Sequence, residues 1–221
     1  MTSETSEKSE IAAKGVSVII CARNEAENLR HYLHAICCQD YPLFEVIVVN
    51  DASEDDTQTV LEHYTQLFRN LRITFVPQQT TAFSRQNAAL LPLTLAAKAA
   101  QYDYLLFVKP DSRPESRNWL SEMMQGFDNE GVDMVVGRTA CFSDRSISLP
   151  LRLLQRFSSF DVSAASNLAF RKDAFFRLVR HTETPSFRKY VVRTPDSTIW
   201  KLPFRSFRDW QLDRRMRFKI V

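Results

Sequence analysis

The sequence predicts an α/β protein with a Rossmann-like, mostly parallel sheet and helices on both faces. Short apolar runs without polar interruption recur along the chain, and the segments between them carry apolar residues at helical spacing. The two kinds of segment alternate from Val16 to Gly137. Short continuous apolar runs are typical of strands buried on both faces. Their alternation with helices favours a parallel sheet covered on two sides.

Five apolar runs are the predicted strands, and each is bounded by polar or turn-forming residues. They are Val16–Cys21, Phe44–Asn50, Leu71–Val76, Tyr104–Lys109 and Val132–Gly137. Ligands of such sheets bind outside the carboxyl ends of the strands, so the polar residues that follow each strand become candidates for a site.

Four segments between the strands are predicted helices. Asn24 can cap the first, on which Leu29, Leu33 and Ile36 share one face. The third is predicted over Ser84–Ala100, where Pro92 is expected to kink or split it. The second and fourth have apolar faces formed by Val60, Leu61, Tyr64, Leu67 and Phe68, and by Trp119, Leu120, Met123, Met124 and Phe127.

Several protein classes are disfavoured by composition. The four glycines stand at positions 15, 126, 131 and 137, and they form neither a GxGxxG nor a GxxxxGK[ST] motif. The four cysteines have no CxxC spacing, and no apolar run reaches the roughly 18 residues of a membrane span. Residues 1–15 are polar and lack the apolar region of a signal peptide, so we expect a flexible tail.

Charge is distributed unevenly along the chain. Residues 1–60 hold 4 Lys and Arg against 11 Asp and Glu, a net charge of −7. Residues 181–221 hold 10 Lys and Arg against 4 Asp and Glu, a net charge of +6. A basic segment of this kind suits phosphates or an anionic membrane surface, although a solvated surface has the same composition.

Polar residues cluster after the first, second and fourth predicted strands. They are Arg23, Asn24 and Glu25, then Asp51, Ser53, Asp55 and Asp56, and then Lys109, Asp111 and Ser112. Because the carboxyl ends of parallel strands meet at one edge of the sheet, we expect these clusters to lie together.

Two motifs in the first 57 residues carry a family resemblance. They are "VSVIICARNEAENL" and "QDYPLFEVIVVNDASEDDT", in which a strand leads into an Asn-Glu helix start and a second strand ends in Asn-Asp-x-Ser-x-Asp-x-Thr. Together they resemble the nucleotide-binding start of the family 2 glycosyltransferases, which have the GT-A fold. The resemblance covers residues 16–140 best. It implies one domain with a nucleotide-sugar-binding half at 16–140 and an acceptor-side segment at 141–221.

The resemblance implies a nucleotide site at the ends of the first two strands. Asp51 would accept a hydrogen bond from the base, for which a carboxylate suits an imide N–H. Cys21, Arg23 and Glu25 would line the same pocket, and Arg85 would face the nucleotide or a phosphate. A structural alternative stays open, in which Asp51 and Ser53 form a turn and cap a helix. For Arg85 the alternative is a solvated helix end.

The stretch "VKPDSRPESRNWL" stands where the family has Asp-x-Asp followed by Pro and Trp-Leu. Asp111 matches the metal-binding aspartate, and Lys109 replaces the first aspartate. The resemblance therefore leaves a role for Mg²⁺ or Mn²⁺ open. Either Lys109 neutralises the diphosphate directly, or metal-dependent transfer is lost.

The acceptor side departs further from the family. "NLAFRKDAFF" (167–176) matches its late strand and short helix, but the acidic pair that supplies the general base is missing afterwards. Glu183 is the nearest carboxylate. Near the end, Gln211, Arg214 and Arg215 match a Gln-x-x-Arg-Trp type motif without its Trp. The same segment also fits a basic amphipathic C-terminal helix on an anionic membrane.

Taken together, the sequence predicts an inverting glycosyltransferase that moves a sugar from a nucleotide-sugar donor, most simply UDP-linked, to a glycan or lipid-linked acceptor in envelope or polysaccharide synthesis. The alternative is a catalytically impaired scaffold that binds nucleotide or membrane. We expect a cytoplasmic location, with peripheral contact at the inner face of the cytoplasmic membrane as an open variant. No nucleic-acid-reading module is recognised, so no nucleic acid partner is expected.

Overall fold

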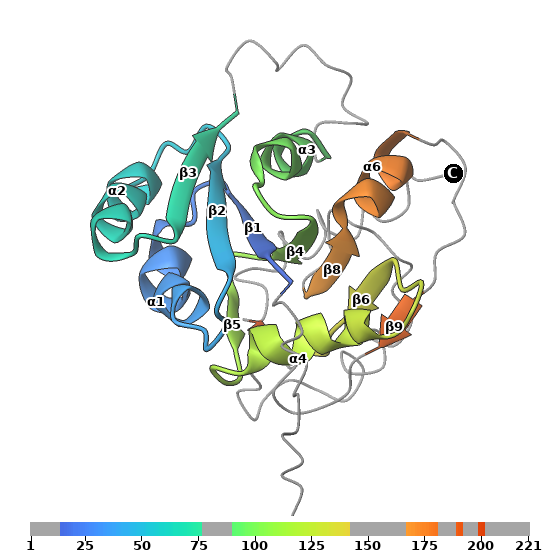
Figure 1. Ribbon diagram of the computed structural model, residues 1–221. Coiled ribbons are helices and arrows are strands. Elements are labelled where there is room, and N and C mark those ends of the chain that lie inside the picture. The colour runs from blue at the N-terminus through green and yellow to red at the C-terminus, as the bar shows by residue number, and fades with distance from the viewer. Residues whose placement is uncertain (1–13, 77–89, 142–166, 181–188, 192–198, 202–221) are drawn as a thin grey trace, which may run out of the picture.

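The computed structural model describes residues 14–76, 90–141, 167–180, 189–191 and 199–201 of the 221. Within these residues, seven strands form one sheet in the order β3-β2-β1-β4-β8-β6-β9 (Figure 1). They are β1 (Val16–Ala22), β2 (Phe44–Asn50), β3 (Leu71–Phe75), β4 (Tyr104–Val108), β6 (Met134–Val136), β8 (Leu168–Arg171) and β9 (Lys189–Val191). All neighbours are parallel except where β8 pairs with β4 and β6. The predicted fold class is confirmed.

Strand β1 lies between β2 and β4 and sets their register. Ile20 stands opposite Val48 on one side and Val108 on the other, and Ala22 stands opposite Asn50. The three strands therefore end at one edge of the sheet, which we call the carboxyl edge.

Helices cover both faces of the sheet (Figure 1). They are α1 (Ala26–Cys37), α2 (Thr57–Leu67) and α4 (Trp119–Gln125) over one face, and α3 (Leu90–Ala99) and α6 (Lys172–Arg180) over the other. Alternate residues of β1 face opposite sides of the sheet. Val18 and Ile20 pack under α1, α2 and α4, and Ile19 packs under α3 and α6. Apolar residues on both sides explain why these strands read as unbroken apolar runs.

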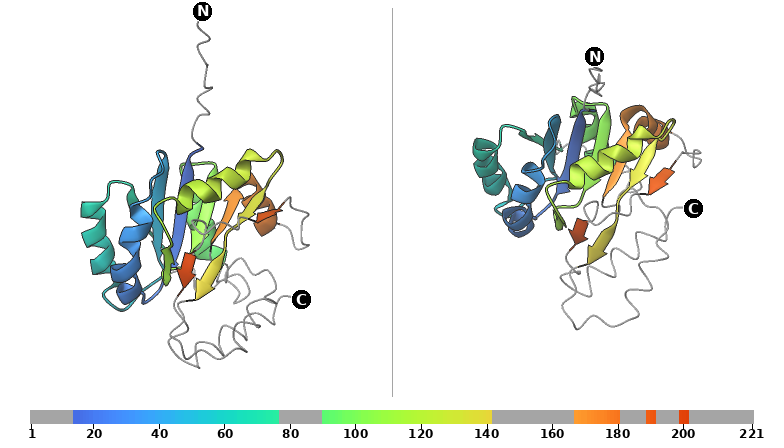
Figure 2. Two further views of the ribbon diagram at one scale, coloured as in Figure 1. Left: turned by 90° about the horizontal axis from the view of Figure 1, so that it is seen from below. Right: turned by 60° about the horizontal axis from the view of Figure 1, so that its bottom comes forward.

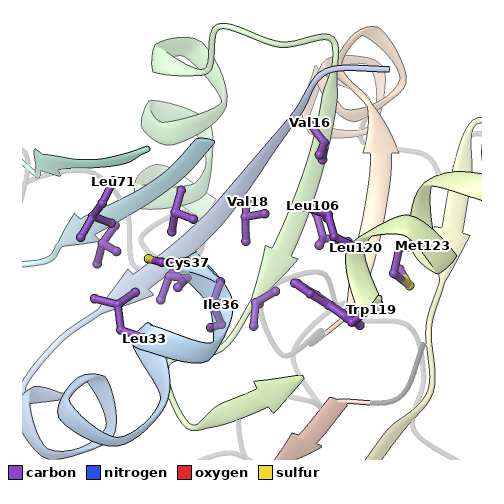
Figure 3. Packing of buried hydrophobic residues seen from close by; sticks show 14 of the residues in the cluster. Val16, Val18, Leu33, Ile36, Cys37, Leu71, Leu106, Trp119, Leu120 and Met123 are labelled. Atoms are coloured by element: carbon purple, nitrogen blue, oxygen red, sulfur yellow. The ribbon is translucent and has the colours of Figure 1, made fainter. Parts of the chain in front are cut away.

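Trp119 is the largest fully buried side chain on the α1–α4 face (Figure 3). Its indole Nε1 donates to Asn167 Oδ1 at 2.8 Å. Asn167 is itself fully buried with φ 65°, and its backbone N–H donates to Phe107 O at 3.0 Å. Its amide Nδ2 donates to Arg138 O at 2.7 Å. Asn167 thus ties β4, the end of β6 and α4 together.

Close packing at this junction excludes a side chain at Gly137. A Cβ there would lie 2.1 Å from Asn167 Nδ2 and 2.6 Å from Met123 Sδ. The glycine that ends the predicted fifth strand is therefore required by its neighbours.

The opposite edge of the sheet holds a buried carboxylate. Glu45 is 2% exposed; its Oε1 accepts from Ser17 Oγ at 2.7 Å and from the Gln101 N–H at 2.8 Å. Its Oε2 pairs with Arg72 Nη1 at 2.8 Å. Because its partners come from several elements, this group holds the amino-terminal ends of β1, β2 and β3 in place.

Two features differ from the sequence prediction. Of the helix predicted over Ser84–Ala100, α3 (Leu90–Ala99) is continuous through Pro92, and residues 84–89 lie outside the described ones. A second sheet, which the sequence does not predict, has the order β5-β10-β7 and comprises Ser112–Pro114, Ile199–Lys201 and Thr139–Cys141 (Figure 2). Strands of three residues are too short to show a period.

Candidate functional site

The carboxyl edge brings together three of the predicted polar clusters. One loop joins β1 to α1, a second joins β2 to α2, and a third follows β4. The first two are joined directly, because the Asp51 N–H donates to Ala22 O at 2.9 Å. The third follows Val108, which is paired with Ile20 of β1. Cys21, Arg23, Glu25, Asp51, Lys109 and Asp111 therefore all lie along this edge.

Asp51 is partly buried next to Cys21. Burial raises the pKa of the Cys21 thiol to about 12, and the negative charge of Asp51 adds to the rise. Cys21 is therefore a neutral thiol at physiological pH. Within the described part of the chain, the Asp51 carboxylate has no hydrogen bond or ion pair, so its oxygens can accept from a ligand.

The structural alternative has support at Ser53, which lies in the turn and accepts from the Asn24 N–H through its Oγ, but none at the Asp51 side chain. The turn after β2 is made by Asn50, whose Oδ1 accepts from the Ser53 N–H at 3.1 Å. At the start of α2, Asp55 Oδ1 accepts from the Thr57 N–H at 2.9 Å. Neither the turn nor the helix start uses the Asp51 side chain.

Four side chains fasten the β1–α1 loop to the β2–α2 loop. The Asn24 N–H donates to Ser53 Oγ at 3.0 Å, and Asn24 Oδ1 accepts from the Glu54 N–H at 2.7 Å. We call these bonds, together with those of Asp55 and Thr57 described next, the loop latch.

Asp55 and Thr57 cap α1 from the neighbouring loop. Asp55 Oδ2 accepts from the Ala26 N–H at 3.1 Å, and Thr57 Oγ1 accepts from the Glu25 N–H at 2.9 Å. The prediction that Asn24 caps this helix is wrong, because the N-cap residue of α1 is Glu25. The Glu25 side chain makes no capping bond and instead accepts from Asn28 Nδ2. A tertiary contact supplies the acceptors instead.

The latch also alters the acidity of Asp55. Partial desolvation raises the pKa of Asp55, but hydrogen bonds from Thr57 and Ala26 outweigh it, and the pKa lies below its ordinary value. The carboxylate is therefore ionised at neutral pH, as an acceptor of several N–H and O–H groups requires.

The Lys109-Pro110-Asp111 stretch forms the turn between β4 and β5. Pro110 is buried, and Lys109 and Asp111 are partly buried. The turn is closed by the Ser112 N–H, which donates to Lys109 O at 3.1 Å, and Ser112 Oγ donates to Asp111 Oδ1 at 3.3 Å. Lys109 and Asp111 thus flank one tight turn at the carboxyl edge.

A divalent ion held by protein groups alone does not fit the described residues. Nowhere among them do three or more His, Cys, Asp or Glu side chains form a group that could hold a metal ion. Asp111 is one hard oxygen ligand, and Lys109 stands where a second would be needed. An ion at this turn would therefore need further ligands from a bound diphosphate, from water or from residues outside the described ones.

The C-terminal part of the chain returns to the Asp111 turn. Strand β10 pairs antiparallel with β5 (Figure 2). In this pairing Lys201 stands opposite Ser112. The last residue of β10 is therefore paired with the residue that directly follows Asp111.

Five predicted site residues lie outside the described residues: Arg85, Glu183, Gln211, Arg214 and Arg215. Sequence reasoning placed Asp55 among the polar candidates without naming its partners, and assigned no role to Thr57 or Asn167. The Asn-Asp-x-Ser-x-Asp-x-Thr motif did include Asp55 and Thr57. Their role could not be predicted from it, because the groups that they bond come from another loop. Asn167 begins the 167–176 segment that matches the family's late strand, but nothing in that match indicated a buried amide.

A surface hollow of about 630 Å³ is lined by Lys14, Phe127, Asp128, Asn129, Glu130, Gly131 and Arg171. It lies toward the amino-terminal ends of β1 and β4, away from the carboxyl edge. Among the residues placed by the structure, no helix combines the length and apolar character needed to span a bilayer.

The sheet order, the covering helices and the polar carboxyl edge define a GT-A type α/β fold. The sequence profile of the family described as "Glycosyl transferase family 2" matches residues 17–190. The chain belongs to this family.

Two curated relatives are similar over part of their length. Glycosyltransferase AglE of Haloferax volcanii is 31% identical over 124 residues, which cover 55% of this chain and 38% of AglE. The protein described as "Putative teichuronic acid biosynthesis glycosyltransferase TuaG" of Bacillus subtilis is 24% identical over 134 residues, or 61% of this chain and 47% of TuaG. The matched part thus spans less than half of either relative.

Solved structures share the fold. The mannosyltransferase PcManGT of Pyrobaculum calidifontis, in complex with GDP-Man and Mn²⁺, has a TM-score of 0.62 at 20% identity, covering 93% of this chain and 63% of that one. S. aureus TarS 1–349 in complex with UDP-GlcNAc has a TM-score of 0.61 at 17% identity, covering 87% and 59%. At these identities the likeness shows the fold alone.

Proposed function

We propose that this protein transfers a sugar from a nucleotide-sugar donor, UDP-linked, to an acceptor hydroxyl with inversion at the anomeric carbon. The observation that carries the proposal is the carboxyl edge, where an Asp51 carboxylate without a bonding partner in the described residues lies on the same edge as the Asp111 turn. The relatives with bound UDP-GlcNAc and GDP-Man support a nucleotide-sugar donor in this fold.

The nucleotide would lie against the ends of β1 and β2. Asp51 would accept from the imide N–H of uracil, with Cys21 and Glu25 at the sides of the base. Arg23 is exposed on the same edge, where its guanidinium can stack on the base or pair with a phosphate.

The diphosphate would lie at the Asp111 turn. In the transfer step the acceptor oxygen bonds to the anomeric carbon as the bond to the diphosphate oxygen breaks, and the nucleoside diphosphate leaves. Lys109 stabilises the charge that develops on the leaving group. The acceptor proton goes to a carboxylate, for which we propose Glu183.

Further cationic groups would come from the C-terminal segment. We propose that Gln211, Arg214 and Arg215 contact the diphosphate, and that Arg85 faces the nucleotide from the segment before α3. The pairing of Lys201 opposite Ser112 supports this, because it returns the chain to the Asp111 turn.

The acceptor is proposed to be a glycan or a lipid-linked glycan of an envelope or polysaccharide pathway. The name of TuaG refers to teichuronic acid biosynthesis, which supports this class. We place the reaction in the cytoplasm, with the basic residues 181–221 in peripheral contact with the inner face of the cytoplasmic membrane.

The experiment is a transfer assay with purified protein and a panel of UDP- and GDP-sugars, with and without EDTA. We expect release of UDP that depends on a glycan or lipid-linked acceptor. Absence of both transfer and donor hydrolysis across the panel would contradict the proposed reaction.

A second candidate function is a nucleotide-binding scaffold without turnover. The observation that favours the scaffold is Lys109 in place of a carboxylate. Replacing a carboxylate by an ammonium group makes the local charge more positive by two. Calorimetry with UDP separates the two functions, since the scaffold binds UDP and shows no transfer under any metal condition.

Replacing Lys109 by Asp tests which role the lysine has. If the lysine substitutes for a cation, the wild-type activity should withstand EDTA, and Lys109→Asp should lower the activity in EDTA by roughly 10²-fold or more. The measurement is the rate of UDP release with EDTA and with Mn²⁺.

The contrary outcome has a distinct signature. If Lys109→Asp creates or raises activity that requires Mn²⁺, the lysine marks a lost metal site. Lys98→Asp is the matched control, because Lys98 is an exposed lysine in the last turn of α3, and it should change neither rate.

A further inference from the structure

The two loops that carry Arg23 and Asp51 are held in backbone conformations that L-residues rarely adopt. Asn24, directly after Arg23, has φ 55°, and Ala52, directly after Asp51, has φ 49°. The left-handed region costs a residue such as alanine roughly 1–2 kcal/mol, so the surrounding structure must hold it there. Each strained residue is adjacent to a candidate nucleotide contact.

The loop latch supplies the interactions that hold these conformations. Asn24 uses both its backbone N–H and its side-chain oxygen on the opposite loop, through Ser53 and Glu54. Asp55 accepts from Ala26 and Thr57, and Thr57 Oγ1 accepts from Glu25. These side chains are occupied with one another, so the latch acts on the loops and leaves ligand contact to Arg23 and Asp51.

Resting on the proposed function, we propose that Asp55 and Thr57 are positioning residues that lock the two loops together before the donor arrives. Arg23 and Asp51 are thereby presented to the nucleotide at fixed positions. A protein with unlatched loops must order them when the nucleotide binds, and fixing each residue costs roughly 1–2 kcal/mol. The latch therefore acts on donor affinity and leaves the chemical step unchanged.

Asp55→Ala is the central variant, and two others match it. Asp56→Ala removes the neighbouring aspartate, which is exposed and whose Oδ2 lies 3.1 Å from Arg30 Nη2. Glu45→Gln weakens the buried group at the opposite edge of the sheet and controls for general loss of stability. Thr57→Val is a second test of the latch, because it removes the hydroxyl at nearly constant volume.

Three readouts are taken on each variant of the whole 221-residue chain. Amide hydrogen exchange in the absence of nucleotide should accelerate at Glu25, Ala26 and Glu54 in Asp55→Ala and not in Asp56→Ala. UDP affinity by calorimetry should fall at least about tenfold in Asp55→Ala and Thr57→Val. In the transfer assay the donor KM should rise while kcat stays unchanged, and Asp55→Asn, which keeps one acceptor oxygen, should recover part of the loss.

The inference is overturned if Asp55→Ala binds UDP as tightly as the wild type. It is also overturned if Glu45→Gln, at an equal loss of thermal stability, weakens UDP binding as much. If the wild type binds neither UDP nor GDP, the proposed function fails, and the positioning role falls with it. The exchange rates then still show whether the loops are locked.

Discussion

Replacing Asp51 by alanine is expected to weaken UDP binding roughly 10- to 100-fold, because a hydrogen bond to a charged group contributes about 1.5–3 kcal/mol. The carboxylate is partly buried beside Cys21 and has no bonding partner within the described structure. The variant would leave the imide N–H of the base without an acceptor. Isothermal calorimetry with UDP measures the effect.

The choice of nucleotide sharpens this prediction. Cytosine has no hydrogen on the ring nitrogen that corresponds to the imide of uracil, so Asp51→Ala should change the affinity for CDP little. Asp56→Ala is the matched control, because its carboxylate is exposed and pairs with Arg30. Equal losses for UDP and CDP would show that Asp51 does not read the base.

Replacing Trp119 by alanine is expected to lower the free energy of unfolding by roughly 3–5 kcal/mol. The indole is fully buried, and its removal creates a cavity between α4 and the sheet (Figure 3). It also leaves Asn167 Oδ1 without the N–H that lies 2.8 Å away. Urea denaturation of the purified variant measures the loss.

Two further variants separate packing from hydrogen bonding at this position. Trp119→Phe keeps most of the apolar volume and should cost less, with the lost hydrogen bond contributing about 1–3 kcal/mol. Leu67→Ala, at a side chain that is 59% exposed, should change stability by less than about 0.5 kcal/mol. A loss below about 1 kcal/mol for Trp119→Ala would mean that the junction repacks around Asn167.

The predicted strands that form the body of the sheet were recognisable because both of their faces are buried. The runs beginning at Val16, Phe44 and Tyr104 became β1, β2 and β4, with ends that differ by one residue at most. The small sheet had no such signal, because β5, β7 and β10 are three residues long and find their partners far along the chain.

The location of the candidate site was predictable from the sequence, but the contacts that hold its loops in place were not. Strand ends located Arg23, Asp51 and Asp111 at one edge, since that follows from parallel pairing. The capping of α1 was mispredicted at Asn24, because local sequence cannot show that Asp55 of another loop supplies the acceptor. The roles of Arg85, Glu183, Gln211, Arg214 and Arg215 remain predictions.

The position of β10 between β5 and β7 has a consequence for the order of folding. Strands β1 to β4 find one another early, since they follow in sequence, whereas β10 must close a long loop to reach Ser112. During synthesis on the ribosome, most of the large sheet can form before residues 199–201 emerge. We therefore expect the Asp111 turn to reach its final form late, so that a nascent chain acquires a folded core before it acquires a complete donor edge.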